Sequence, residues 1–82
     1  MINLPNGIYQ HYKGQHYEVI GLAHHTETKK PMVLYKALYP LPELEQQYGN
    51  TVIFTRPYDL FIESVIIKNK KVPRFKLIKS HS

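Results

Sequence analysis

The sequence contains no cysteine and no tryptophan. Without cysteine there is no disulfide framework, no thiolate zinc site and no cysteine nucleophile. Long hydrophobic runs are also missing, because the apolar stretches at 31–35 and 65–67 are far shorter than the ~18 residues of a membrane-spanning helix. The first residues, MINLPNG, lack the basic and then apolar pattern of a secretory signal. These absences favour a cytoplasmic protein with no membrane segment.

Acidic residues are scarce, and their distribution is uneven. The chain of 82 residues, which we expect to form one domain over 1–82, has a net charge of +5. No acidic residue follows Glu63. The basic residues beyond it are Lys68, Lys70, Lys71, Arg74, Lys76 and Lys79. Such a segment attracts nucleic acid or an acidic partner, but it is also typical of a solvated face that protects an edge strand.

Aromatic and β-branched residues flank Lys13-Gly14, which predicts a β-hairpin over the first part of the chain. Gly21 lies inside its second strand, a usual place for a bulge or sharp bend. A two-residue turn would give the opposite pairs Tyr12–Gln15, His11–His16 and Tyr9–Glu18.

The rest of the chain alternates short strands with turn signals. MVLYKALY predicts a third strand that Pro40 ends, and PLPELEQQYGN predicts a short helical insertion that begins near Pro42. TVIFT predicts a fourth strand, followed by a turn or 3₁₀ segment in RPYDLF. ESVIIK and VPRFKLIK predict a closing pair around the link NKK. The pattern therefore indicates an all-β protein of five to six short strands with a short helical or 3₁₀ insertion, in a small, strongly bent barrel.

Five motifs occur in order along the chain: GIYQHYKG, YEVIGLAHHTET, PMVLYKALY, RPYDLF and VPRFKLI. Together they resemble a family of short bacterial proteins catalogued only as a domain of unknown function. The resemblance covers about residues 7–78, nearly the whole chain. It implies a small SH3-like β-barrel, and it implies no activity and no cofactor.

The segment HHTET, residues 24–28, is the most polar motif. Neighbouring residues on a strand point to opposite faces, so His24 and His25 should not share a metal ion, and we predict no metal site and no cofactor. His25 and Glu27 are a candidate acid–base pair for a small enzyme. The alternative is that His25, Thr26 and Glu27 bind the loop backbone and fix the hairpin. We assign no catalytic residue.

Tyrosines and proline-flanked arginines are the remaining candidates. The seven tyrosines exceed what so small a core can bury, so some should form a surface suited to peptides or stacked bases. Proline beside Arg56 and beside Arg74 stiffens the backbone, which favours binding of an anion or of an internal carboxylate. The predicted binding residues are Tyr9, His11, His25, Glu27, Tyr35, Arg56 and Arg74.

The sequence thus predicts a non-enzymatic binding or accessory module for a peptide or protein partner, either a monomer or a weak homodimer. The first alternative is a nucleic-acid-binding barrel that uses the basic C-terminal strands. The second is a small enzyme that uses His25 and Glu27.

Overall fold

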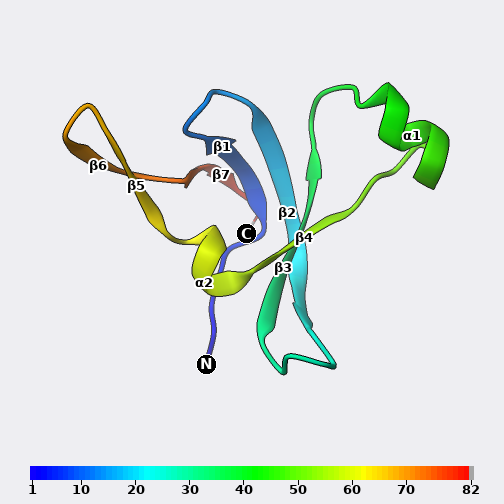
Figure 1. Ribbon diagram of the computed structural model, residues 1–82, viewed down its shortest axis with the longest axis horizontal. Helices are drawn as coiled ribbons and strands as arrows, with labels where there is room; N and C mark the ends of the chain where they lie inside the picture. The colour runs from blue at the N-terminus through cyan, green and yellow to red at the C-terminus, as the bar shows by residue number, and fades with distance from the viewer. Residues whose placement is uncertain (82) are drawn as a thin grey trace.

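The computed structural model describes residues 1–81, which form seven strands and two short helices (Figure 1). The strands are β1 (Gly7–His11), β2 (His16–His24), β3 (Pro31–Ala37), β4 (Phe54–Pro57), β5 (Ser64–Ile67), β6 (Lys70–Pro73) and β7 (Phe75–Ser80). Helix α1 (Pro42–Tyr48) precedes β4, and helix α2 (Tyr58–Phe61) follows it directly. No helix among residues 1–81 is long and apolar enough to cross a membrane.

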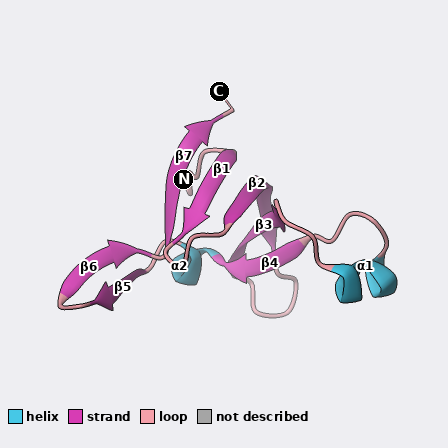
Figure 2. Cartoon of the chain, turned by 90° about the horizontal axis from the view of Figure 1, so that it is seen from above, coloured by secondary structure: helices cyan, strands magenta, loops and turns pink. Residues whose placement is uncertain are grey.

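Five strands form one antiparallel sheet in the order β4-β3-β2-β1-β7, and β5 and β6 form a separate two-stranded sheet (Figure 2). The predicted all-β class is confirmed to the extent that the fold is mostly β. The predicted small, bent barrel does not close, because β4 and β7 remain the two edges of an open sheet within the described residues. The physical reason is that β4 has only four residues and turns into α2 at Pro57 instead of continuing beside β7.

The first hairpin is confirmed, but its predicted register is wrong. Residues 12–15 all belong to the turn, and the His11 amide donates to the Gln15 carbonyl at 2.8 Å. The longer turn shifts every pair by one residue, so Tyr9 lies opposite Tyr17. His16 lies opposite Gln10, and His11 lies opposite Phe75 on the other side of β1. A shift of one residue reverses the faces of the side chains, and it brings both tyrosines to the same face of the sheet.

Two other local predictions are confirmed. The pairing of β2 with β3 shifts between Val19 and Gly21, which is the expected bulge and bends the sheet. The predicted helical insertion is α1, which has Pro42 in its first turn and ends at Gly49. The carboxylate of Glu45 accepts the Leu41 amide at 2.8 Å and satisfies one free donor at the start of this helix.

The predicted last strand, VPRFKLIK, is interrupted at Arg74, which lies between β6 and β7. The Arg74 amide donates to the Glu63 carbonyl at 3.1 Å, while its carbonyl accepts the Tyr12 amide at 3.0 Å. Arg74 is therefore the junction where the chain leaves the β5–β6 hairpin and joins the main sheet. The hairpin itself turns at Lys68 and Asn69, whose φ values of 49° and 65° are those of a type I′ turn.

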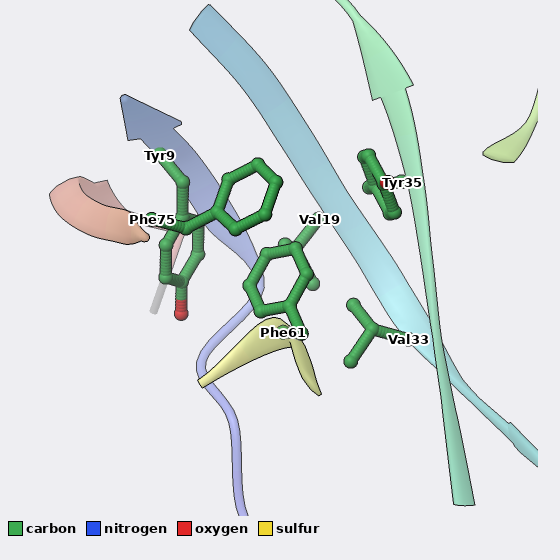
Figure 3. Packing of buried hydrophobic residues seen from close by; sticks show 6 residues of the cluster. All are labelled: Tyr9, Val19, Val33, Tyr35, Phe61 and Phe75. Atoms are coloured by element: carbon green, nitrogen blue, oxygen red, sulfur yellow. The ribbon is translucent and has the colours of Figure 1, made fainter. Parts of the chain in front are cut away.

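The core lies between one face of the sheet and α2 (Figure 3). Its buried members are Tyr9, Val19, Val33, Tyr35, Phe61 and Phe75. Phe61 comes from α2, so this single helical turn closes the core that the open sheet would otherwise expose. The expectation that some tyrosines fill the core is confirmed for Tyr9 and Tyr35.

Candidate functional site

Side chains from five strands, two of them core residues, form one network of ring and guanidinium contacts. Its members are His11 (β1), Tyr17 (β2), Tyr35 (β3), Arg56 (β4) and Phe75 (β7). We call this set the arginine–aromatic cluster. Tyr39 and Arg74 lie next to it.

Phe75 is the centre of the cluster. Its ring centroid lies 5.0 Å from His11, 5.6 Å from Tyr17 and 5.7 Å from Tyr35. The interplanar angles of 79°, 78° and 65° are those of edge-to-face contacts, which the charge distribution of aromatic rings favours. Antiparallel pairing produces this arrangement, because Phe75 lies opposite His11 on the neighbouring strand.

Arg56 holds a positive charge over this aromatic centre. It lies opposite Val33 of β3, and its guanidinium carbon is 5.7 Å from the Phe75 ring centroid. Its Nε donates to the Tyr35 hydroxyl at 3.3 Å. Within residues 1–81 no carboxylate lies within 4.0 Å of this guanidinium, and its terminal amino groups make no hydrogen bond. Arg56 is therefore a half-buried cation whose donor fork has no internal partner in that range.

Tyr17 of the cluster and the neighbouring Tyr39 bring their hydroxyl groups together. The hydroxyl oxygens of Tyr17 and Tyr39 are 2.6 Å apart, and the Tyr17 ring lies 5.6 Å from that of Tyr35. Burial, followed by the hydrogen bond to Tyr39, raises the pKa of Tyr17 far above its usual value. The Tyr17 hydroxyl therefore stays protonated and offers a neutral hydrogen-bonding group next to the Arg56 charge.

His11 is kept neutral by its surroundings. Burial lowers its pKa, and the positive charges of Arg56, Lys13 and Arg74 lower it further. Its Nδ1 accepts the backbone amide of Lys13 at 3.2 Å, so a neutral ring carries its proton on Nε2. This geometry makes His11 a hydrogen-bond donor at neutral pH, whereas a charged ring is disfavoured beside so many cations.

Arg74 has a partial internal partner. Its Nη2 lies 3.1 Å from the Glu63 carboxylate in an ion pair, and both side chains are partly exposed. Its Nε is buried and has no hydrogen-bond partner among the described residues. Among residues 1–81, Glu63 is the only acidic residue that forms an ion pair with an arginine.

The structure brings together His11, Tyr35 and Arg56, and it places Arg74 beside them. The prediction that Tyr9 and Tyr35 lie on an exposed surface is wrong, because their side chains are only 4% and 6% exposed and both belong to the core. The Tyr9 hydroxyl donates to the Pro5 carbonyl at 2.7 Å, whereas the Tyr35 hydroxyl accepts the Nε–H of Arg56.

His25 and Glu27 lie in the β2–β3 turn, at the opposite end of β2 from Tyr17 (Figure 1). The structure therefore separates them from the cluster. The His25 Nδ1 accepts the backbone amides of Glu27 and Thr28, each at 3.2 Å. The Glu27 carboxylate makes no hydrogen bond or ion pair within residues 1–81, so the two side chains do not form an acid–base pair there. The His25 ring instead binds the loop backbone, as the alternative interpretation of HHTET proposed for it.

No group of three or more histidine, aspartate or glutamate side chains among residues 1–81 is placed to hold a metal ion. The basic residues of the nucleic-acid hypothesis divide between two sheets. Lys68, Lys70 and Lys71 belong to the β5–β6 hairpin and its turn, whereas Lys76 and Lys79 lie on β7. All five are exposed, so binding of nucleic acid through them stays a prediction.

Comparison with known proteins identifies a family that covers most of the chain. The model of a family described as "Protein of unknown function (DUF1653)" matches residues 7–77. The chain belongs to the DUF1653 family. It is similar to the crystal structure of a DUF1653 protein from Bordetella bronchiseptica, with a TM-score of 0.75 and 31% sequence identity over 98% of this chain and 94% of that one. The comparison with curated proteins found no match.

Three residues outside the predicted binding set contribute to this region of the DUF1653 protein: Tyr17 and Phe75, which belong to the cluster, and Tyr39, which lies next to it. Strand alternation would have placed Tyr17 on the same face as Val19. Nothing local in the sequence indicates that Phe75 meets them, because it comes from β7, more than fifty positions further along the chain.

Proposed function

We propose that this DUF1653 protein is a non-enzymatic binding module that holds a peptide or protein partner at the arginine–aromatic cluster. The environment of Arg56 is the main observation in support of this proposal. It is a half-buried guanidinium, held over Phe75 and by the Tyr35 hydroxyl, whose donor fork has no carboxylate partner within residues 1–81. A fixed cation of this kind costs little entropy when it binds a planar anion.

The neighbours of Arg56 favour a peptide carboxylate as its ligand. A carboxylate can accept two parallel hydrogen bonds from an arginine fork, and such charge-assisted bonds are stronger than neutral ones. The Tyr17 and Tyr39 hydroxyls and the aromatic rings beside them suit the polar backbone and apolar side chains that surround a carboxylate in a peptide. The terminal amino groups of Arg56 would then donate hydrogen bonds to the carboxylate of the partner, since this chain supplies no acceptor for them within residues 1–81.

We also propose that the fold is a partly open SH3-like barrel in a bacterial, cytoplasmic protein. The return of β7 beside β1 and the short helix after β4 support the fold assignment. The similar crystal structure comes from Bordetella bronchiseptica, which supports a bacterial source for this protein. Fold alone does not supply function, so the binding proposal rests on the cluster.

The test is an amide-shift titration of labelled protein with the blocked tripeptide Phe-Asp-Phe and with its matched Phe-Asn-Phe control. We expect the aspartyl peptide to shift Arg56, including its Nε–H, and His11. The R56Q variant should bind at least about tenfold more weakly, since a hydrogen bond to a charged group contributes about 1.5–3 kcal/mol. R56K should bind with intermediate affinity. K30Q, which removes an exposed charge in the β2–β3 turn, should bind as the wild type does.

Equal affinity for the aspartyl and asparaginyl peptides, or for R56Q and the wild type, would contradict the proposal. A single-stranded RNA oligonucleotide provides the comparison for the nucleic-acid alternative. Shifts at Lys68, Lys70, Lys71, Arg74, Lys76 and Lys79 with RNA alone, and an affinity that falls steeply with salt, would favour that alternative instead.

A further inference from the structure

The β5–β6 hairpin, residues 64–73, forms an arm that extends away from the main sheet (Figure 2). Its two strands pair only with each other among residues 1–81. An isolated two-stranded hairpin is only marginally stable in water. This arm also exposes large apolar side chains, because Ile66 is 67% and Ile67 is 39% exposed. Both features are those of an element that a partner completes.

The pairing shows which backbone groups of β5 are free. Ile67 and Lys70 flank the two-residue turn, and the pair that closes such a turn exchanges hydrogen bonds. The Arg74 amide donates to the Glu63 carbonyl four positions before Ile67, which gives the same alternation at the other end of the arm. The odd-numbered residues of β5 therefore point their backbone groups toward β6, and Ser64 and Ile66 point theirs outward.

The two outer edges of the arm differ in what they offer. On β6 the outward positions are Lys71 and Pro73, which pair with Ile66 and Ser64. Proline has no amide hydrogen, and a lysine on an edge discourages pairing, so this edge is protected. The outer edge of β5 has the β-branched sequence SVII, and the amides and carbonyls of Ser64 and Ile66 have no backbone partner among residues 1–81. It is the edge that can accept another strand.

The positive charge of the arm indicates what kind of strand the outer edge of β5 accepts. Between 64 and 80 the chain has no acidic residue, and three lysines lie on the arm itself: Lys68, Lys70 and Lys71. Pairing of two copies would bring all of these lysines together in one small sheet, which is unfavourable. A strand with acidic side chains would neutralise them, and its apolar side chains would cover Ile66.

We infer that the free edge of β5 binds an extended segment of a partner protein, with alternating acidic and apolar residues, which adds to the arm as a third strand. This mode of recognition uses backbone hydrogen bonds for affinity and alternate side chains for specificity. It requires no residue of the arginine–aromatic cluster, so the inference goes beyond the proposed function and stands independently of it.

The experiment uses the full-length labelled protein and three blocked hexapeptides. The first alternates glutamate and valine, the second alternates lysine and valine, and the third is the glutamate peptide with alternate backbone amides methylated. We expect the first to shift the amides of Ser64 and Ile66 and to slow their hydrogen exchange. The other two should bind at least tenfold more weakly, because one has the wrong charge and the other cannot pair its backbone.

Two variants separate the arm from the rest of the molecule. I66K places a charge on the edge and should reduce binding of the glutamate peptide at least tenfold. I62K adds the same charge at a site 49% exposed just after α2, outside the arm, and should bind as the wild type does. R56Q should also leave this binding unchanged, so the failure of one proposal is distinguishable from the failure of the other. The amide spectrum of each variant shows whether it is folded.

Equal binding of the methylated peptide would overturn strand addition, and equal binding of the lysine peptide would overturn the acidic partner. Absence of shifts at Ser64 and Ile66 with every peptide would overturn the inference as a whole. Shifts there that depend on protein concentration alone, with a dimer in sedimentation, would assign the edge to a second copy of the chain instead.

Discussion

Phe61 of α2 and Phe75 of β7 lie face to face, with ring centroids 4.1 Å apart and planes only 4° from parallel. Both side chains are buried, at 1% and 7% exposure. Phe75 also makes the central contacts of the arginine–aromatic cluster. The Phe75 ring therefore belongs both to the core and to the candidate site. Because Phe61 of α2 stacks on it, the packing of α2 fixes the position of the ring that lies under Arg56.

Removal of the Phe61 ring should be severely destabilising. F61A leaves a cavity in a small core, and such changes cost about 3–5 kcal/mol of unfolding free energy. Urea denaturation measures the loss. The matched control is L60A, which removes an apolar side chain that is 44% exposed in the same helix and should change stability by less than about 0.5 kcal/mol. Similar losses in both variants would show that α2 does not close the core.

Gly7 should tolerate no side chain. A Cβ there would lie 2.1 Å from the Lys79 carbonyl oxygen, and the φ of 154° is rare for other residues. G7A should therefore separate β1 from β7 and lower the unfolding free energy by at least about 1–3 kcal/mol. G21A is the control, because a Cβ at Gly21 meets nothing within 4 Å. Denaturation of both variants, with amide shifts of β7, measures the difference; equal stability would contradict the close approach.

His11 should make the protein less stable in mild acid. Its pKa is lowered in the folded state, first by burial, so the unfolded chain takes up the proton more readily below the ordinary value of 6.5. The contribution of neutral His11 to the unfolding free energy is fully present above pH 6.5, and it is lost as the pH falls through the folded-state pKa. Glu18, whose pKa is lowered chiefly by its hydrogen bond to His81, adds a similar loss only below its ordinary value of 4.5.

The measurement is the unfolding free energy of the wild type and of H11Q between pH 7.5 and pH 5. The two proteins share every other titratable group, so the difference between the two slopes reports His11. We expect H11Q to lose less stability over this range. An equal slope would show that protonation of His11 costs the folded state nothing.

His25 should stabilise its turn through Nδ1. H25A removes the acceptor of the Glu27 and Thr28 amides and should cost about 1 kcal/mol, as the loss of a capping acceptor does. Asparagine carries its side-chain oxygen at the same number of bonds from the backbone as Nδ1, so H25N should restore most of the loss. Thermal unfolding and hydrogen exchange of the Thr28 amide check this. Wild-type stability in H25A would contradict it.

Much of the local structure follows from the sequence. The bulge at Gly21, the helix that begins at Pro42 and the turn in HHTET depend on residues within a few positions of one another. Their propensities and hydrogen bonds act locally, so the order of residues is enough to predict them. The same holds for the excess of lysine after Glu63, which requires no fold at all to be recognised.

Only the tertiary structure decided which of these elements meet. The turn of the first hairpin is longer than predicted, so His16 lies opposite Gln10 instead of His11. The break at Arg74 divides one predicted strand between the arm and an edge of the main sheet. Pairing of β7 with β1 joins residues more than sixty positions apart. Such pairing is set by turn length, register and burial together, and a local pattern contains none of these. That is why the sequence indicated Arg56 and His25 alike, whereas the folded chain gathers the first with aromatic rings and leaves the second at a distant turn.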